Sequence, residues 1–262
     1  MPGEARGIDD GGGFYREPLL YDVINTPGTA GEVDALERLA RRYAPPAPWR
    51  WLEPGCGTGR YLRVLRGRGH AVAGYDALPG MLDYARARLA RWPDGWALAA
   101  GTFCGAAPDL PPAEVAFCPV NSLRHLRDDE AVIAHLGQVA RLLAPGGVYV
   151  VGLDLHAPDA VPDEDAWTGA RGRLQVRQVV QYLPPEGGSR RERVIVQVVV
   201  RRPGGERYHG WSYDLRTYTD AQWSALIAAA GWRRVATADD RGRPVAPDGP
   251  LTYQYEILRP DR

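Results

Sequence analysis

The chain has 262 residues, enough to bury a full core in one large α/β domain or in a domain that carries an insertion. Its 32 lysine and arginine residues balance 32 aspartate and glutamate residues, so the chain as a whole is not charged for binding nucleic acid or an acidic membrane. The three dispersed cysteines lack the spacing of a metal site or a disulfide framework, and no stretch is apolar enough to span a bilayer, so we expect a cytoplasmic protein with a small-molecule partner and no metal.

Helix and strand patterns alternate from the first third of the chain onward. Residues 31–43 have helical periodicity, and the prolines that follow end this helix. Within residues 49–160, strands are expected at 50–54, 70–76, 96–101, 113–121 and 148–155, and helices at 59–69, 78–92 and 128–143. The alternation predicts a parallel sheet with helices on both faces.

The pattern changes at residue 161. Segments 172–183, 193–202 and 207–219 alternate with period two and are separated by turn compositions, which predicts an antiparallel meander over residues 161–218. A last helix, capped by Asp220 and ended by Gly231, and two further strands lie within residues 219–262 and complete the core. The expected fold is a doubly wound, seven-stranded, mostly parallel Rossmann-like sheet with an inserted antiparallel β-meander.

The turn after the first strand reads WLEPGCGTGRYL, residues 51–62, and places Glu53 just before three glycines at alternate positions. The dinucleotide fingerprint needs its third glycine where this chain has Arg60, and Glu53 would repel a pyrophosphate. A cationic ligand without phosphate suits the turn better. Asp76 ends the next strand, about 20 residues on, where nucleotide sites place an acid for the ribose hydroxyls. That acid indicates a nucleoside without saying which one.

Four segments in this order resemble motifs of the class I S-adenosylmethionine-dependent methyltransferases, in their small-molecule branch: LEPGCGTG, GYDALPGMLDYAR, CPVNSLRHL and LAPGGVYVV. The resemblance is close over residues 49–155 and looser over 218–232. It implies an enzyme that transfers the methyl group of S-adenosylmethionine to a nitrogen or oxygen of a small molecule. This cofactor carries an ammonium and a sulfonium but no phosphate, which agrees with Glu53. The resemblance also implies that residues 1–48 form a helical lid.

The implied cofactor site comprises Tyr21, Glu53, Gly55, Cys56, Gly57, Gly59, Asp76, Ala77, Met81, Thr102, Phe103, Pro119 and Asn121. In it the glycines approach the methionine part, Asp76 binds the ribose, and Cys56 contributes only its backbone. Thr102 and Phe103 flank the adenine. Many family members carry an acid after the third strand where this chain has GTF, so adenine N6 would be read by a backbone carbonyl or by Thr102.

His125 is the catalytic candidate, because similar S-x-x-H-L segments occur in methyltransferases that act on small amines, including amino sugars. Histidine can take a proton near neutral pH, although an exposed or capping role is the alternative. The acceptor candidates are Tyr15, Ser122, Asp154, His156, Trp211, Tyr213 and Arg216. Ordinary packing is the alternative for Tyr15, and capping of a loop for Asp154 and His156. The meander residues could instead form a solvated face or a contact in a homodimer.

Two other functions stay open. A non-catalytic S-adenosylmethionine-binding or regulatory protein would bind the cofactor without turnover. A nicotinamide-dependent oxidoreductase would need to bind NAD tightly. Glu53 and the spacing of the glycines both argue against NAD binding. The residues do not decide between nitrogen and oxygen as the methylated atom.

Overall fold

The computed structural model describes residues 13–155, 161–246 and 253–261. Its helical elements are the 3₁₀ turns η1 (Phe14–Arg16) and η2 (Ser122–His125) and the helices α1 (Pro18–Asn25), α2 (Thr29–Tyr43), α3 (Arg60–Gly67), α4 (Pro79–Leu89), α5 (Asp129–Leu142) and α6 (Asp220–Ala229). Its strands are β1 (Arg50–Pro54), β2 (Ala71–Asp76), β3 (Trp96–Ala100), β4 (Ala113–Cys118), β5 (Leu143–Asp154), β6 (Asp163–Arg171), β7 (Leu174–Leu183), β8 (Arg191–Arg202), β9 (Gly205–Arg216), β10 (Trp232–Ala238), β11 (Pro244–Val245) and β12 (Tyr253–Pro260).

The main sheet has the strand order β11-β10-β12-β5-β4-β1-β2-β3. Strands β1 to β5 pair in parallel, whereas β12 runs antiparallel to both β5 and β10. The doubly wound, mostly parallel sheet is therefore confirmed, with the two-residue strand β11 added at its edge. The strand order reverses between β1 and β4, and such a switch point is where open α/β sheets bind ligands.

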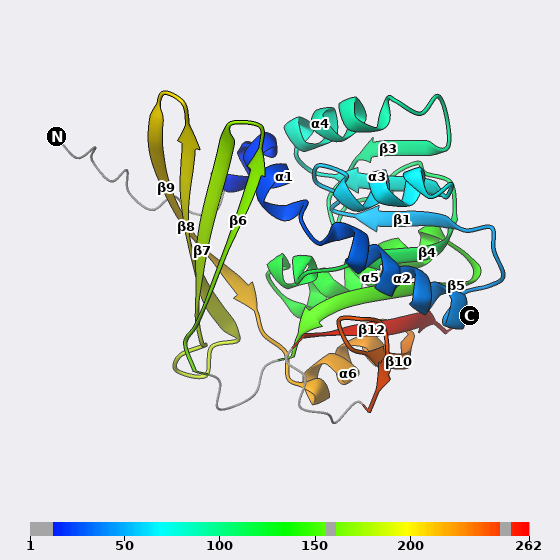
Figure 1. The fold of residues 1–262 in the computed structure, drawn as a ribbon. Coiled ribbons are helices and arrows are strands. Elements are labelled where there is room, and N and C mark those ends of the chain that lie inside the picture. The colour runs from blue at the N-terminus through cyan, green and yellow to red at the C-terminus, as the bar shows by residue number, and fades with distance from the viewer. Residues whose placement is uncertain (1–12, 156–160, 247–252, 262) are drawn as a thin grey trace.

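Helices cover both faces of the main sheet (Figure 1). Side chains of α2, α3 and α4 share one buried cluster with Val115 and Phe117 of β4, and side chains of α5 and α6 share the other with Ala116 and Cys118. Successive residues of β4 thus point into opposite cores, which is why this strand reads as a continuous apolar run.

A second, antiparallel sheet has the order β6-β7-β8-β9 and stands beside the main sheet, with α1 between the two (Figure 1). Its inward valines pack against Val23 and Ile24 of α1. Gly169 of β6 lies so close to this helix that a Cβ there would come within 2.1 Å of the carbonyl oxygen of Val23. Strand β6 was not expected, because its sequence DEDAWTGAR is mostly polar and exposed.

Two local expectations were wrong. The strand expected at 148–155 begins earlier, at Leu143, so residues 144–147 (APGG) lie within β5, where the pairing with β4 jumps from Ala113 opposite Leu143 to Val115 opposite Val148. The cap of α6 is Thr219 and not Asp220, because the Thr219 hydroxyl accepts from the amide of Gln222 in a capping box. Among the described residues, none of the helices has the length and apolar character needed to cross a membrane.

Candidate active site

A cavity of about 550 Å³ lies at the carboxyl ends of β1, β2 and β4, at the switch point of the main sheet. One part of its wall comes from the main sheet, another from η1 and α1, and a third from the inward face of the β6–β9 sheet. The predicted cofactor and acceptor residues that line it are Tyr15, Tyr21, Glu53, Gly55, Cys56, Gly57, Asp76, Ala77, Met81, Thr102, Phe103, Pro119, Asn121, Ser122, His125, Trp211 and Tyr213. Segments distant in sequence therefore share one cavity.

The glycine turn adopts backbone angles that side chains disfavour. The φ angles of Gly55, Gly57 and Gly59 are +65°, +51° and +69°, all in the left-handed region. A Cβ at Gly55 would lie 2.6 Å from Cζ of Phe103, so the ring packs directly on the turn. Gly59 does not line the cavity; it caps α3, and a Cβ there would lie 3.2 Å from Cβ of Ala85 on α4. The absence of a side chain at Gly59 therefore lets the start of α3 pack closely against α4.

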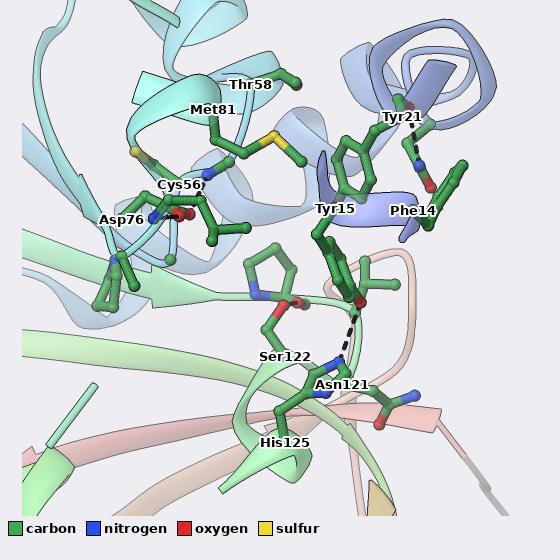
Figure 2. A pocket seen from close by; sticks show the side chains of 18 of the residues that line it. Phe14, Tyr15, Tyr21, Cys56, Thr58, Asp76, Met81, Asn121, Ser122 and His125 are labelled. Atoms are coloured by element: carbon green, nitrogen blue, oxygen red, sulfur yellow. Dashed lines mark hydrogen bonds between the residues drawn. The ribbon is translucent and has the colours of Figure 1, made fainter. Parts of the chain in front are cut away.

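Asp76 ties the glycine turn to the end of β2 (Figure 2). Its Oδ2 accepts from the amide of Gly57 at 2.8 Å, and its Oδ1 accepts from the amide of Leu78 at 2.9 Å. Burial raises the pKa of the Asp76 carboxyl, and the two amides oppose that shift. Each carboxylate oxygen has a further lone pair, so the carboxylate can also accept from a ligand hydroxyl.

The charged groups of the wall sit around the same turn. Glu53 is 5% exposed, and its Oε2 has no hydrogen-bond partner among the described residues. Burial raises the pKa of the Glu53 carboxyl well above its usual value, Arg60 opposes this, and Asp76 adds to it. A ligand cation beside Glu53 would act in the same direction as Arg60 and stabilise the ionised carboxylate. Sequence reasoning missed Arg60, a buried cation that lines the cavity and donates to the hydroxyl of Thr29 at 2.7 Å.

The loop after β3 is held by α5. The carbonyl of Thr102 accepts from Nε2 of Gln138 at 3.1 Å, and the carbonyl of Phe103 lies 3.1 Å from Nδ1 of His135. His135 is fully buried, and its ring lies edge-on to the Phe103 ring at 4.9 Å between centroids. These contacts keep the expected adenine-flanking residues at the cavity wall.

The segment after β4 has an unusual backbone. Val120 and Asn121 have φ angles of +57° and +61°. Asparagine tolerates such an angle, but it is rare for valine, which is β-branched. Asn121 is locked by Asp154, whose amide donates to its Oδ1 at 2.8 Å and whose Oδ2 accepts from its Nδ2 at 2.6 Å. Asp154 does not line the cavity, so its expected acceptor contact is replaced by this bracing role.

His125 faces Tyr15 across the cavity, with 3.2 Å between Nε2 and the tyrosine hydroxyl (Figure 2). The ring of Tyr213 lies 5.1 Å from the His125 ring between centroids. Burial, with a smaller effect of Arg124, lowers the pKa of His125 to about 4. The ring is thus neutral near pH 7 and a weaker base than its ordinary pKa implied. Burial also raises the pKa of Tyr15 well above its usual value, so both partners of this contact are neutral near pH 7.

Two expected acceptor residues are not in the wall. Arg216 points to Asp129, with 2.9 Å between its guanidinium nitrogen and the carboxylate, and does not line the cavity. Its expected role is therefore not supported by the geometry, because its charge is already paired. His156 lies outside the described residues.

The wall from the second sheet contains residues that sequence reasoning missed. These are Trp167, Gln178, Val180, Tyr182, Val196 and Leu215, together with Phe14 of η1. On β7, β8 and β9 they occupy alternate positions, so the period-two pattern could have found them once the inward face was known. Among residues 13–155, 161–246 and 253–261, no cluster of three or more His, Cys, Asp or Glu side chains could hold a metal ion.

Comparisons with known proteins agree with this geometry. Residues 52–147 match the methyltransferase domain family. The malonyl-[acyl-carrier protein] O-methyltransferase of Serratia marcescens is 32% identical over 171 residues, which cover 65% of this chain and 61% of that protein. The demethylmenaquinone methyltransferase of Tropheryma whipplei is 36% identical over 101 residues, covering 38% and 39%. The chain thus spans at most about three fifths of these relatives.

Solved structures match over nearly the whole chain. DesVI of Streptomyces venezuelae is 23% identical, with a TM-score of 0.70 over 91% of this chain and 94% of that one. The sugar N-methyltransferase KedS8 of Streptoalloteichus is 19% identical, with a TM-score of 0.66 over 98% of both chains. At these identities the likeness establishes a shared fold. The family match over residues 52–147 indicates a methyltransferase domain within this fold.

The residues present fit S-adenosylmethionine. Glu53 offers a buried carboxylate oxygen without a partner among the described residues, which suits an ammonium. At Gly57, which lines the cavity, the nearest atom that an added Cβ would meet is Cε1 of Tyr21 at 3.8 Å, so a ligand can approach this backbone closely. Asp76 is already oriented for hydroxyl groups. Arg60 lies in the same wall, where it is paired with Glu32 at 3.0 Å and adds positive charge beside the glycine turn. The donor set is therefore complementary to the charges of this cofactor.

Proposed function

We propose that the protein is an S-adenosylmethionine-dependent methyltransferase that acts on a nitrogen or oxygen of a small molecule. The observation that carries this proposal is the continuity of the cavity. Its wall runs from Glu53 and Asp76 of the main sheet to Trp211 and Tyr213 of the β6–β9 sheet. The donor and the acceptor would thus lie in one enclosure.

The chain has a limited chemical task. When bound, S-adenosylmethionine supplies a methyl group on a sulfonium, which leaves readily as a thioether. The residues therefore have to align the acceptor and exclude water. Glu53, Asp76 and Arg60 would fix the donor, while η1 and α1 would close the cavity over it through Phe14, Tyr15 and Tyr21.

Tyr15 and His125 would orient the nucleophile. With Nε2 of His125 unprotonated, the Tyr15 hydroxyl would donate a hydrogen bond to it, and the tyrosine oxygen could then accept a hydrogen bond from the N–H or O–H of the acceptor. Because the pKa of His125 is lowered to about 4, it would serve as a neutral hydrogen-bond acceptor and not as a strong base. An acceptor amine would have to react in its neutral form.

Nitrogen is favoured by the structural neighbours. KedS8 is described as a sugar N-methyltransferase, and a structure from Micromonospora echinaspora, with a TM-score of 0.64, is an amino pentose methyltransferase. One sequence relative is an O-methyltransferase, so oxygen remains the second candidate. An amine acceptor is also consistent with Tyr15 and His125, because a neutral amine can donate its N–H to these two neutral side chains and needs no strong base.

Calorimetric titration with S-adenosylhomocysteine, with NAD as a parallel control, tests the donor site. We expect micromolar binding of S-adenosylhomocysteine alone. Preference for NAD would overturn the proposal and favour an oxidoreductase. The second step measures S-adenosylhomocysteine release from S-adenosylmethionine with a panel of amines and alcohols. Cofactor binding without turnover on any acceptor would favour a non-catalytic binding protein.

A further inference from the structure

The part of the cavity wall formed by the β6–β9 sheet differs in charge from the rest. The Asp, Glu and Arg side chains among the described lining residues are Glu53, Asp76 and Arg60, and all three belong to the main-sheet side. The second sheet contributes only apolar, aromatic and uncharged polar side chains. A ligand group that carries a charge would be desolvated there without a counter-ion.

One polar side chain in this wall has a buried oxygen without a partner among the described residues. Gln178 of β7 is 6% exposed and lines the cavity, and its Oε1 accepts no hydrogen bond from a described residue. Its cross-strand neighbours are Trp167 on β6 and Val198 on β8. A buried carboxamide without a partner lowers stability, so folding alone gives no reason for it.

The surrounding residues strengthen this point. On the same face, the neighbours of Gln178 along β7 are Val176 and Val180, and those on β8 are Val196 and Val198, all buried. A leucine or methionine would fill this position without an unpaired polar group. This polar exception among four buried valines borders the cavity, which indicates a ligand as the partner.

We propose that Gln178 determines acceptor specificity by hydrogen bonding to an uncharged hydroxyl or amide group on the body of the acceptor, whose apolar surface packs against Trp167 and Trp211. This inference rests on the proposed function and names the acceptor class. A carboxamide both donates and accepts, as hydroxyl and amide groups do. Anionic acceptor bodies, such as carboxylates and phosphates, would lose their water in this wall without gaining a counter-ion from its lining residues, so we expect them to bind more weakly.

The test uses the full-length protein saturated with S-adenosylhomocysteine and two probes of similar size, cyclohexanol and cyclohexanecarboxylate. Their affinities are measured by ligand-observed NMR for the wild type, for Gln178→Leu and for the matched control Gln181→Leu. Gln181 lies on the opposite face of β7, where its amide donates to Glu164 at 2.8 Å. The control therefore makes the same chemical change outside the cavity.

We expect the wild type to bind cyclohexanol at least about tenfold more tightly than cyclohexanecarboxylate, and Gln178→Leu to weaken cyclohexanol binding by about tenfold. Gln181→Leu should bind both probes as the wild type does. Equal cyclohexanol affinity of the wild type and Gln178→Leu, preference for the carboxylate, or no probe binding would overturn the inference. Intact S-adenosylhomocysteine binding in that case would leave the proposed function standing.

Thermal unfolding adds a readout that separates the ligand role from a structural one. Removing an unpaired buried amide should leave the melting temperature of Gln178→Leu unchanged or raise it. A lower melting temperature in both Gln178→Leu and Gln178→Met would mean that the amide supports the fold, and would overturn the ligand role.

Discussion

Replacing Asp76 by Asn tests the cofactor site most directly. The carboxylate accepts from the amides of Gly57 and Leu78 at 2.8 and 2.9 Å. Asn has one acceptor oxygen, so its amide nitrogen must face one of these N–H donors. One hydrogen bond to a charged acceptor is then lost, worth about 1.5–3 kcal/mol. A ribose hydroxyl of the cofactor would lose a charged acceptor in the same way. We therefore expect S-adenosylhomocysteine to bind about 10–150-fold more weakly.

Isothermal titration calorimetry of the wild type and of Asp76→Asn provides the measurement. Asp83→Asn is the control, because Asp83 is an exposed residue of α4 that pairs with Arg86. It should bind S-adenosylhomocysteine like the wild type. Affinity of Asp76→Asn within about twofold of the wild type would refute the assignment of Asp76 to the cofactor site, since it would lie below the loss of a single charged hydrogen bond.

Three further predictions concern the lid, the acceptor pair and pH. Asp22 of α1 is fully buried and forms ion pairs with Arg63, Arg88 and Arg171, so Asp22→Asn should lower the free energy of unfolding, measured by urea denaturation, by about 3 kcal/mol. The control Asp83→Asn should lower it by less than about 1 kcal/mol. Equal losses in the two variants would contradict the inference that these ion pairs hold α1 in place. His125→Asn and Tyr15→Phe would each remove a hydrogen bond that orients the acceptor, so each should lower turnover about tenfold with unchanged S-adenosylhomocysteine affinity. The double variant should be no slower than the slower single variant, and additive losses would show independent roles. Burial lowers the pKa of His135 to about 4, so its contribution to stability is intact above about pH 6.5 and falls as pH drops toward 4. Between pH 7 and pH 5 the free energy of unfolding of the wild type should therefore fall by about 2 kcal/mol more than that of His135→Gln. If the free energies of unfolding of the two proteins changed in parallel with pH, the prediction would be wrong.

Much of the main-sheet half of the site could be predicted from local patterns. The three alternate glycines predicted a turn with close backbone approach, and all three have positive φ. Asp76 was expected at the end of β2 by its spacing from the turn, and it lies in the cavity wall. Both features depend on residues close together in the chain, because a turn and a strand end are set by local backbone preferences.

Other residues needed the assembled chain. Asp154 and Arg216 have the chemistry of ligand-binding groups, but Asp154 braces Asn121 and Arg216 pairs with Asp129, 87 residues away. The pKa of His125 depends on how deeply Tyr15 and Tyr213 enclose it, and sequence position contains no measure of that burial. The sequence therefore could not show what these three side chains contact or how deeply they are buried.

By itself the sequence determined the alternation of strands and helices, the glycine turn and the charges around it, because hydrophobic periodicity and backbone preference act over a few residues. Only the tertiary structure decided that polar β6 joins the second sheet, that this sheet closes the cavity, and that Gln178 lines it with an oxygen that has no partner among the described residues. The reason is register: a shift of one residue between strands would turn every side chain of β7 to the other face, and cross-strand pairing is settled only when the sheet packs against α1.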